Sequence, residues 1–215
     1  MISQTPLDDE IASLESRLLL LPPLAVAIHA ASCSERLIAF YKAFCEKDRC
    51  GDFDAVRLAL DRIWDFLLGN WASTDGLHTL LEEVSRLTPD VDRFDSIESS
   101  VAQDVCVCLD SAVRRCLHEE ETLRPNAVEY ALGTLRSIVC VMETGCLDLG
   151  DSTESLAFES KLLSHPLIAS ELRCQKEDSD DLRLTIDRPG KIVAHIRRRS
   201  IANQIDSTRV LQELL

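Results

Sequence analysis

The stretch from Cys33 to Leu68 constrains the fold more than any other part of the chain, because it has the pattern of two consecutive amphipathic helices. Apolar side chains in its first half recur at spacings of three and four residues, the period of one helix face. They are Leu37, Phe40, Tyr41 and Phe44. Gly51 and Asp52 then provide a turn and a helix cap. The same spacing returns afterwards in Val56, Ala59, Leu60, Ile63, Trp64 and Leu67. The stretch therefore predicts two helices joined by a tight turn.

Helical periodicity continues along most of the chain. The predicted helices are Asp8–Leu21, Pro23–Lys47, one between Asp52 and Gly69, Asp75–Leu87, Ser96–Glu119, Pro125–Cys146, Ser152–Leu163 and Pro166–Lys176. Leu182–Ile186 is the one short segment that alternates like a strand. We therefore predict an all-α fold, a single compact domain of about seven to nine helices. Ser96–Glu119 and Pro125–Cys146 are apolar over much of their circumference, so we expect them at its centre.

The C-terminal end differs in composition from the rest. An acidic run, Glu177–Asp181, is followed by a turn signal at Arg188–Lys191 and by a basic segment around Arg197–Arg199. We predict a helical domain over residues 1–186 and a basic C-terminal tail over 187–215. The favoured interpretation is a solvated linker followed by a helix docked on the acidic domain, because opposite charges pair within one molecule. The alternative is an arm that docks on another protein.

The formal net charge is −14, from 37 acidic against 23 basic residues. Proteins bind nucleic acid mainly by neutralising phosphates with Lys and Arg, and a strongly acidic surface repels phosphates. The charge therefore argues against nucleic acid as a partner. It is compatible with a partner protein that presents a basic surface.

The apolar segment Leu18–Ile28 does not predict a signal peptide or a membrane span. It follows an acidic N-terminus, MISQTPLDDE, whereas a signal peptide needs positive charge there. Pro22 and Pro23 also divide it, so neither part approaches the ~20 residues that cross a bilayer. We expect a cytoplasmic protein with no membrane partner.

The nine cysteines do not form the pattern of a disulfide framework or a metal site. Their number is odd, the chain is long, and several lie on apolar helix stripes, where a thiol acts as a small hydrophobe. Cys106 and Cys108 are two residues apart on a predicted helix and point about 200° apart. Cys45 and Cys50 have a metal-like spacing but no second pair accompanies them. We therefore predict reduced thiols and no metal or cofactor.

A few charged residues lie on otherwise apolar helices and form a candidate inter-helix polar cluster: Glu35, Arg36, Asp61 and Asp110. Buried charges must be paired, so the favoured interpretation is that Arg36, Arg57 or Arg114 pairs with the carboxylates and locks helices together. The alternative is a pocket between helices that holds a ligand or a divalent metal. The sequence contains no phosphate-binding loop, serine-hydrolase elbow or metalloprotease motif, and we predict no catalytic residue.

Several short patches occur in the order found in one bacterial family. They are Cys33-Ser-Glu35-Arg36, the aromatic pair Tyr41 and Phe44, Gly51-Asp52, Leu60-Asp61 with Ile63-Trp64, Cys108–Ala112, Ala127–Glu129 and His165–Leu167. In this order the chain resembles the YjaG-like family of unknown function, domain of unknown function 416, in patches over Leu14–Leu184. It departs from that family at Ile38–Tyr41, where a Pro-Asn-Tyr step is usual. The resemblance implies a cytoplasmic all-helical protein, with an association to histidine-kinase signalling through gene neighbourhood.

Three functional hypotheses remain from the sequence. The favoured one is a non-catalytic protein-interaction or regulatory module, linked to histidine-kinase signalling, with an unidentified protein partner. The second is an immunity-type protein that masks a basic toxin surface. The third is a helical bundle that binds a small ligand or a metal. Self-association into a homodimer is left open.

Overall fold

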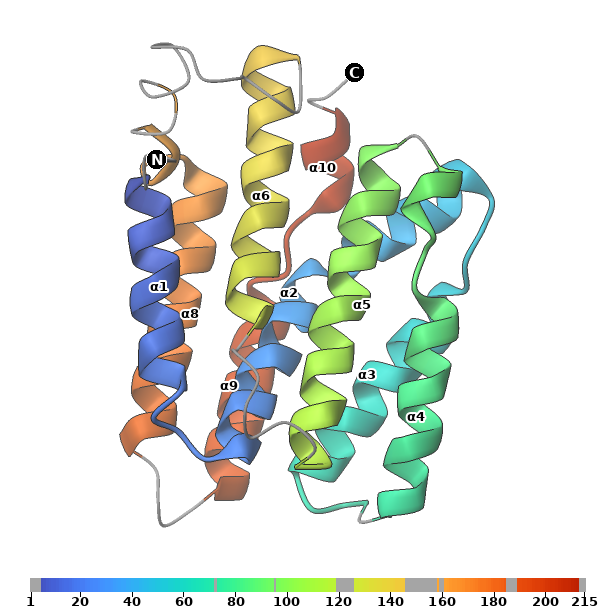
Figure 1. Cartoon of the computed structure of the whole chain (residues 1–215), viewed down its shortest axis with the longest axis vertical. Coiled ribbons are helices and arrows are strands. Elements are labelled where there is room, and N and C mark those ends of the chain that lie inside the picture. The colour runs from blue at the N-terminus through green and yellow to red at the C-terminus, as the bar shows by residue number, and fades with distance from the viewer. Residues whose placement is uncertain are drawn as a thin grey trace.

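The computed structural model describes residues 5–71, 73–94, 96–118, 126–145, 158, 161–184 and 189–212. Throughout these residues the fold is all-helical, as predicted, and the helices form one compact body (Figure 1). The α-helices are α1 (Pro6–Leu18), α2 (Pro23–Asp48), α3 (Phe53–Leu67), α4 (Thr74–Leu87), α5 (Ile97–Cys116), α6 (Asn126–Thr144), α8 (Pro166–Leu184), α9 (Pro189–Ala202) and α10 (Ser207–Gln212). A short 3₁₀ turn, η1, spans Val91–Arg93. The helix predicted over Ser152–Leu163 falls mainly outside the described residues.

Helix α2 lies at the centre of the molecule. It contacts α3, α5, α6, α8, α9 and α10, and its packing against α5 is the most extensive in the structure. Every residue from Val26 to Ile38 is buried, so this part of α2 is enclosed on all sides. We predicted α5 and α6 at the centre, but α2 takes the place expected for α6. The polar residues of α2 concealed its burial, since they are buried by pairing with one another and with neighbouring helices.

Local sequence signals explain where the helices begin. Asp52 accepts a hydrogen bond from the Ala55 backbone N–H, as predicted, and so caps α3. Ser96 caps α5 in the same way through the Ser99 N–H. Each cap satisfies a backbone donor that has no partner within its own helix.

The turn between α2 and α3 requires glycine at position 51. Gly51 has a φ of +83°, a left-handed conformation that side chains with a Cβ adopt at a cost. A Cβ there would lie 3.0 Å from the Cys45 Sγ and 3.1 Å from the Tyr41 Oη. Tyr41 is itself fixed, because its hydroxyl donates to the Leu87 carbonyl at 2.7 Å. The turn therefore packs against Tyr41, whose hydroxyl is bound to the end of α4.

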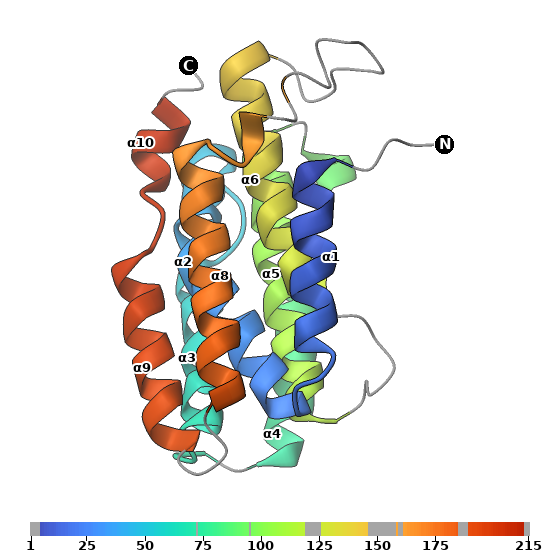
Figure 2. The same cartoon turned by 90° about the vertical axis from the view of Figure 1, so that its left-hand side faces the viewer.

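The acidic run Glu177–Asp181 is not a linker, contrary to our prediction. It lies inside α8, which continues to Leu184 instead of ending at Lys176, and Leu182 to Leu184 are helical rather than extended. Asp178 and Ser179 are fully buried. The run stays in the body because its charges meet opposite charges on other helices, as in the ion pair of Asp180 with Arg17 on α1. Figure 2 shows α8 beside α9, with α1 on its other side.

The described residues of the C-terminal tail pack against the rest of the protein. Val193, Ile196 and Val210 belong to the hydrophobic core. Between α9 and α10, the Ile205 N–H donates to the Arg36 carbonyl at 2.9 Å, and the Ser207 hydroxyl donates to the Ala39 carbonyl at 3.0 Å. The predicted boundary at 186/187 falls outside the described residues. Within the described part of the chain, no helix combines the length and apolar character needed to cross a bilayer.

Candidate functional site

Two neighbouring residues of α2, Glu35 and Arg36, each hold a separate network of buried ion pairs. Both side chains are 1% exposed. Because they are adjacent on a helix, they point about 100° apart and meet different neighbours. Arg36 faces α8 and α9, whereas Glu35 faces α3 and the segment after α9.

The Arg36 network joins α2, α8 and α9. The Arg36 guanidinium makes two hydrogen bonds of 2.7 Å to the Glu171 carboxylate, and its third nitrogen donates to Asp178 Oδ2 at 2.9 Å. Asp178 also accepts from the Ser32 hydroxyl at 2.7 Å and from the Arg199 guanidinium. Burial alone would raise the pKa of Asp178, but Arg36 and the other donors hold it below its usual value. Asp178 is therefore ionised and paired within the protein interior.

The Glu35 network joins α2, α3 and the C-terminal segment. Arg57 donates to both Glu35 oxygens, at 2.6 and 3.0 Å. The Trp64 indole N–H donates to Glu35 at 2.9 Å, and the Gln204 amide donates to it at 2.8 Å. Arg57 also bridges to Asp61 at 2.9 Å, and Asp61 in turn pairs with Arg197 of α9. One carboxylate thus ties together three parts of the chain.

The four residues of the sequence-derived polar cluster are placed differently by the structure. Glu35 and Asp61 are brought together through Arg57. Arg36 lies in the adjoining network with α8 and α9. Asp110 pairs with Arg114, one turn away on its own helix α5, at 2.7 Å.

Sequence reasoning missed three members of the Arg36 network: Glu171, Asp178 and Arg199. Glu171 and Asp178 are seven residues apart, so they share one face of a helix. That spacing would have been visible if the helical period had been continued through the acidic run. Their burial was hidden because the counter-charge, Arg36, is 135 residues away from Glu171 in the sequence.

The buried thiol of Cys33 lacks the surroundings of an activated nucleophile. The Cys33 Sγ lies 3.8 Å from the His29 Nδ1, and both residues are fully buried. Burial raises the pKa of the Cys33 thiol well above its ordinary value, and it lowers the pKa of His29 to about 4. At neutral pH the pair is therefore a thiol beside a neutral imidazole. A reactive cysteine needs a lowered pKa and access to solvent. The eight cysteines in the described residues are all free thiols.

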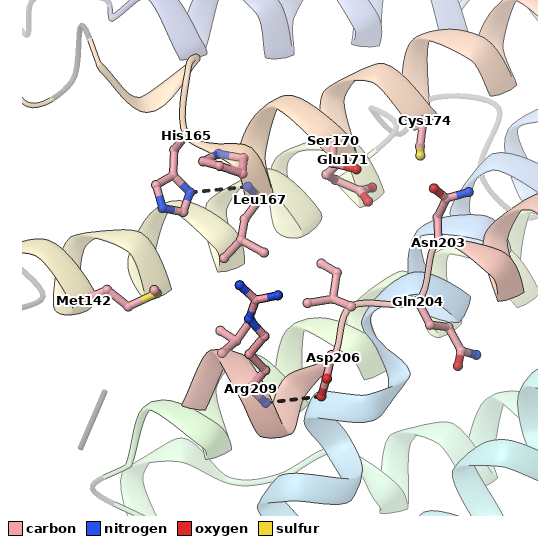
Figure 3. A pocket seen from close by; sticks show the side chains of 13 residues that line it. Met142, His165, Leu167, Ser170, Glu171, Cys174, Asn203, Gln204, Asp206 and Arg209 are labelled. Atoms are coloured by element: carbon pink, nitrogen blue, oxygen red, sulfur yellow. Dashed lines mark hydrogen bonds between the residues drawn. The ribbon is translucent and has the colours of Figure 1, made fainter. Parts of the chain in front are cut away.

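A cavity of about 430 Å³ opens between α6, α8, α10 and the segment before α10 (Figure 3). The cavity is lined by one residue of α6, by the first half of α8 with the residue before it, and by α10 with the segment that leads into it. These residues are Met142, His165, Pro166, Leu167, Ser170, Glu171, Cys174, Asn203, Gln204, Ile205, Asp206, Arg209 and Val210. Glu171 belongs to the Arg36 network, and Gln204 belongs to the Glu35 network. The cavity wall is therefore joined to both networks, through the ion pair of Glu171 and the hydrogen bond of Gln204. Over the described residues, no three or more His, Cys, Asp or Glu side chains are placed to hold a metal ion.

The comparisons with known proteins agree with the sequence resemblance. A family model described as "Protein of unknown function (DUF416)" matches residues 13–207. The chain belongs to this family. A crystal structure of a DUF416 family protein from Shewanella baltica OS155 is 18% identical, covers 87% of this chain and 93% of its own, and superposes with a TM-score of 0.69. At that identity the likeness shows a shared fold only. A search of the curated proteins found no match.

The DUF416 match extends through α9 and ends where α10 begins. Its last residue, 207, is the first residue of α10. Arg199 and Gln204, which close the two ion networks, therefore lie inside the matched region. The matched region therefore includes α9, although the resemblance that we recognised in the sequence ended near Leu184.

The buried His29 gives this DUF416 protein a measurable dependence of stability on pH. In the unfolded chain its pKa is 6.5, whereas in the fold it is about 4, so between these values only the unfolded state binds the extra proton. Stability is therefore lost as the pH falls from 6.5 to 4. We expect wild type to lose about 3 kcal/mol relative to His29→Asn over this interval, since one pKa unit corresponds to ~1.36 kcal/mol.

Urea unfolding at several pH values between 7 and 4 measures this difference. Taking wild type minus variant removes the titrations that both proteins share. His78→Asn is the control, because it makes the same substitution at an exposed position of α4. The prediction would be contradicted if the difference in the free energy of unfolding between wild type and His29→Asn stayed constant from pH 7 to pH 4.

Proposed function

We propose that this DUF416 protein is a non-catalytic binding module, and that it receives a protein partner at the cavity between α6, α8 and α10. The observation that carries the proposal is the cavity itself. Its volume of about 430 Å³ lies within the ~300–1,000 Å³ range of ligand pockets in proteins. It also has the mixed apolar and polar lining that binding sites use for affinity and orientation.

The state of the buried ionisable groups supports binding over catalysis. Arg36, Glu171 and Asp178 neutralise one another through short hydrogen bonds, and Cys33 is held as a neutral thiol. Catalytic acids and nucleophiles need pKa values poised for proton transfer or attack. These groups are instead suited to keeping the helices around the cavity in a fixed arrangement.

The proposed partner is a cytoplasmic protein with a basic surface around the segment that enters the cavity. The net charge of −14 favours such a partner, because opposite long-range fields accelerate and orient association. A component of histidine-kinase signalling remains our proposal for its class. That part rests on the gene-neighbourhood association of the family.

Capture of the partner with a matched pair of variants tests the proposal. Ser170→Trp fills the cavity from an exposed position on its rim, whereas Ser85→Trp adds the same side chain to an exposed position on α4. Both tagged variants should melt like wild type. We expect wild type and Ser85→Trp to retain the same partner from a lysate of the native cells, and Ser170→Trp to lose it.

The comparison can also contradict the proposal. A partner that is retained equally by Ser170→Trp and by wild type would show that binding occurs elsewhere. If Ser170→Trp captured every protein that wild type captures, the cavity would not be a protein-binding site.

A further inference from the structure

We infer that the cavity between α6, α8 and α10 binds the C-terminal carboxylate of the partner protein, together with an apolar side chain on the partner's last residue. This inference rests on the proposed function and specifies the chemistry of the segment that enters. It follows from three features of the lining: two hydrogen-bond donors, an apolar wall, and an amide oxygen that can accept from a peptide N–H.

The first donor is Arg209 of α10. Its guanidinium extends from α10 into the cavity towards α8 in Figure 3. Arg209 also interacts within the protein. A guanidinium carries five N–H donors, so an internal partner leaves donors for a ligand oxygen. Arginine is the side chain that best matches the planar geometry of a carboxylate.

The second donor is His165, at the start of α8. Its Nδ1 accepts a hydrogen bond from the Leu167 backbone N–H at 3.4 Å. An imidazole nitrogen that accepts is unprotonated, so the ring N–H of His165 is assigned to Nε2. His165 thus contributes an N–H donor on the α8 side of the cavity, opposite Arg209 on α10.

Apolar side chains surround these donors. They are Met142 of α6, Leu167 of α8, Ile205 before α10 and Val210 of α10. Burying an aliphatic side chain of a ligand against this wall removes apolar surface from water, at about 25 cal/mol per Å². A flexible methionine adapts to different aliphatic shapes. The wall therefore favours a ligand with an apolar group close to its charged end.

The remaining charges of the lining disfavour a ligand that carries several negative charges. The Glu171 carboxylate is already paired with Arg36 through two hydrogen bonds. Asp206 accepts from the Arg209 backbone N–H at 3.2 Å and keeps its negative charge close to the cavity. Together with the acidic net charge, these carboxylates disfavour a phosphate or a polyanion.

A further polar group is placed to accept from a peptide backbone. The Asn203 amide donates its N–H to the Arg199 carbonyl at 2.8 Å, and its side-chain oxygen lies on the cavity side in Figure 3. This oxygen is an acceptor for a backbone N–H of the residue that precedes the ligand's terminus. A protein C-terminus supplies the carboxylate, the apolar side chain and the N–H in one short segment.

Titration of N-acetyl-Ala-Ala-Leu by calorimetry tests the inference on the full-length protein. We expect the free carboxylate form to bind about tenfold more tightly than the same peptide with a C-terminal amide, because charge-assisted hydrogen bonds to Arg209 are lost in the amide. Arg209→Gln should remove this difference and melt like wild type. Arg173→Gln, on the exposed side of α8, should retain it.

The outcomes separate this inference from the proposed function. Equal or undetectable binding of the acid and the amide would overturn the carboxylate inference, even where Ser170→Trp loses the captured partner. N-acetyl-leucine that binds as tightly as the tripeptide would identify a small organic acid as the ligand and would also overturn it. Binding of the acid to wild type, combined with partner capture that Ser170→Trp leaves intact, would support the inferred chemistry and contradict the proposed function alone.

Discussion

Replacing Arg36 with methionine should lower the free energy of unfolding by about 3–5 kcal/mol, because the change leaves buried carboxylates without their counter-charge. Arg36 is 1% exposed and contacts both Glu171 and Asp178, which are 3% and 0% exposed. The methionine side chain is apolar and similar in length to that of arginine, so the loss of packing volume is small. The expected effect therefore comes from Glu171, whose carboxylate loses its counter-charge and keeps a hydrogen bond from the Gln175 amide of α8.

Urea unfolding followed by circular dichroism measures the loss, and a double variant isolates its cause. In Arg36→Met/Glu171→Met the unpaired carboxylate is also removed, while Asp178 keeps Arg199 and Ser32. The double variant should be more stable than the single one, because an apolar replacement of a whole buried pair is often neutral. An Arg36→Met variant that loses less than about 1 kcal/mol would contradict a paired, buried network.

Replacing Trp64 with alanine should destabilise the protein by about 3–5 kcal/mol, the usual cost of deleting a large buried aromatic side chain. Trp64 is 0% exposed and packs in the core between α3 and its neighbours. Its indole N–H also donates to Glu35, so the variant removes a hydrogen bond from a buried carboxylate. The Arg197 guanidinium lies 5.9 Å from the ring and loses a cation–π contact as well.

Trp64→Phe separates the two contributions of the indole. Phenylalanine retains most of the packing but has no N–H donor, so its cost should be smaller than that of alanine and should arise largely at Glu35. The denaturant midpoints of the two variants, compared with wild type at constant m-value, give the loss of stability in each. Unchanged melting of a soluble Trp64→Ala variant would show that the side chain is not part of the core.

The helices themselves could be predicted because they depend on local patterns. Apolar spacing located α3 and α4 to within a residue or two, and the side chains of Asp52 and Ser96 marked where α3 and α5 begin. These signals act within one or two turns of the chain. The same patterns were sufficient to predict the all-α fold.

The position of α2 and the course of α8 could not be predicted because they depend on distant partners. A helix carrying His29, Glu35 and Arg36 is expected to expose one face, yet each of these residues is buried. Its burial requires Glu171, Asp178 and Arg57, which arrive from two other helices. A run of acids is likewise expected to be solvated, until its counter-charges are known.

The candidate site was only partly within reach of the sequence for the same reason. Glu35, Arg36 and Asp61 were recognised as charges on apolar helices, and the structure explains how each is paired. The cavity was not foreseen, because its walls combine the start of α8 with a segment nearly forty residues later. His165 and Arg209 have no sequence relation to each other, and only the packing of α10 beside α8 brings them to one cavity.

Native mass spectrometry of untagged protein isolated from its own cells tests the central claim, that the cavity holds a protein partner, most directly. Our account predicts a complex with one further polypeptide, which is present for wild type and Ser85→Trp and absent for Ser170→Trp. A small-molecule or metal mass bound to wild type in place of a polypeptide, and lost in Ser170→Trp, would contradict the claim and assign the cavity to a small ligand.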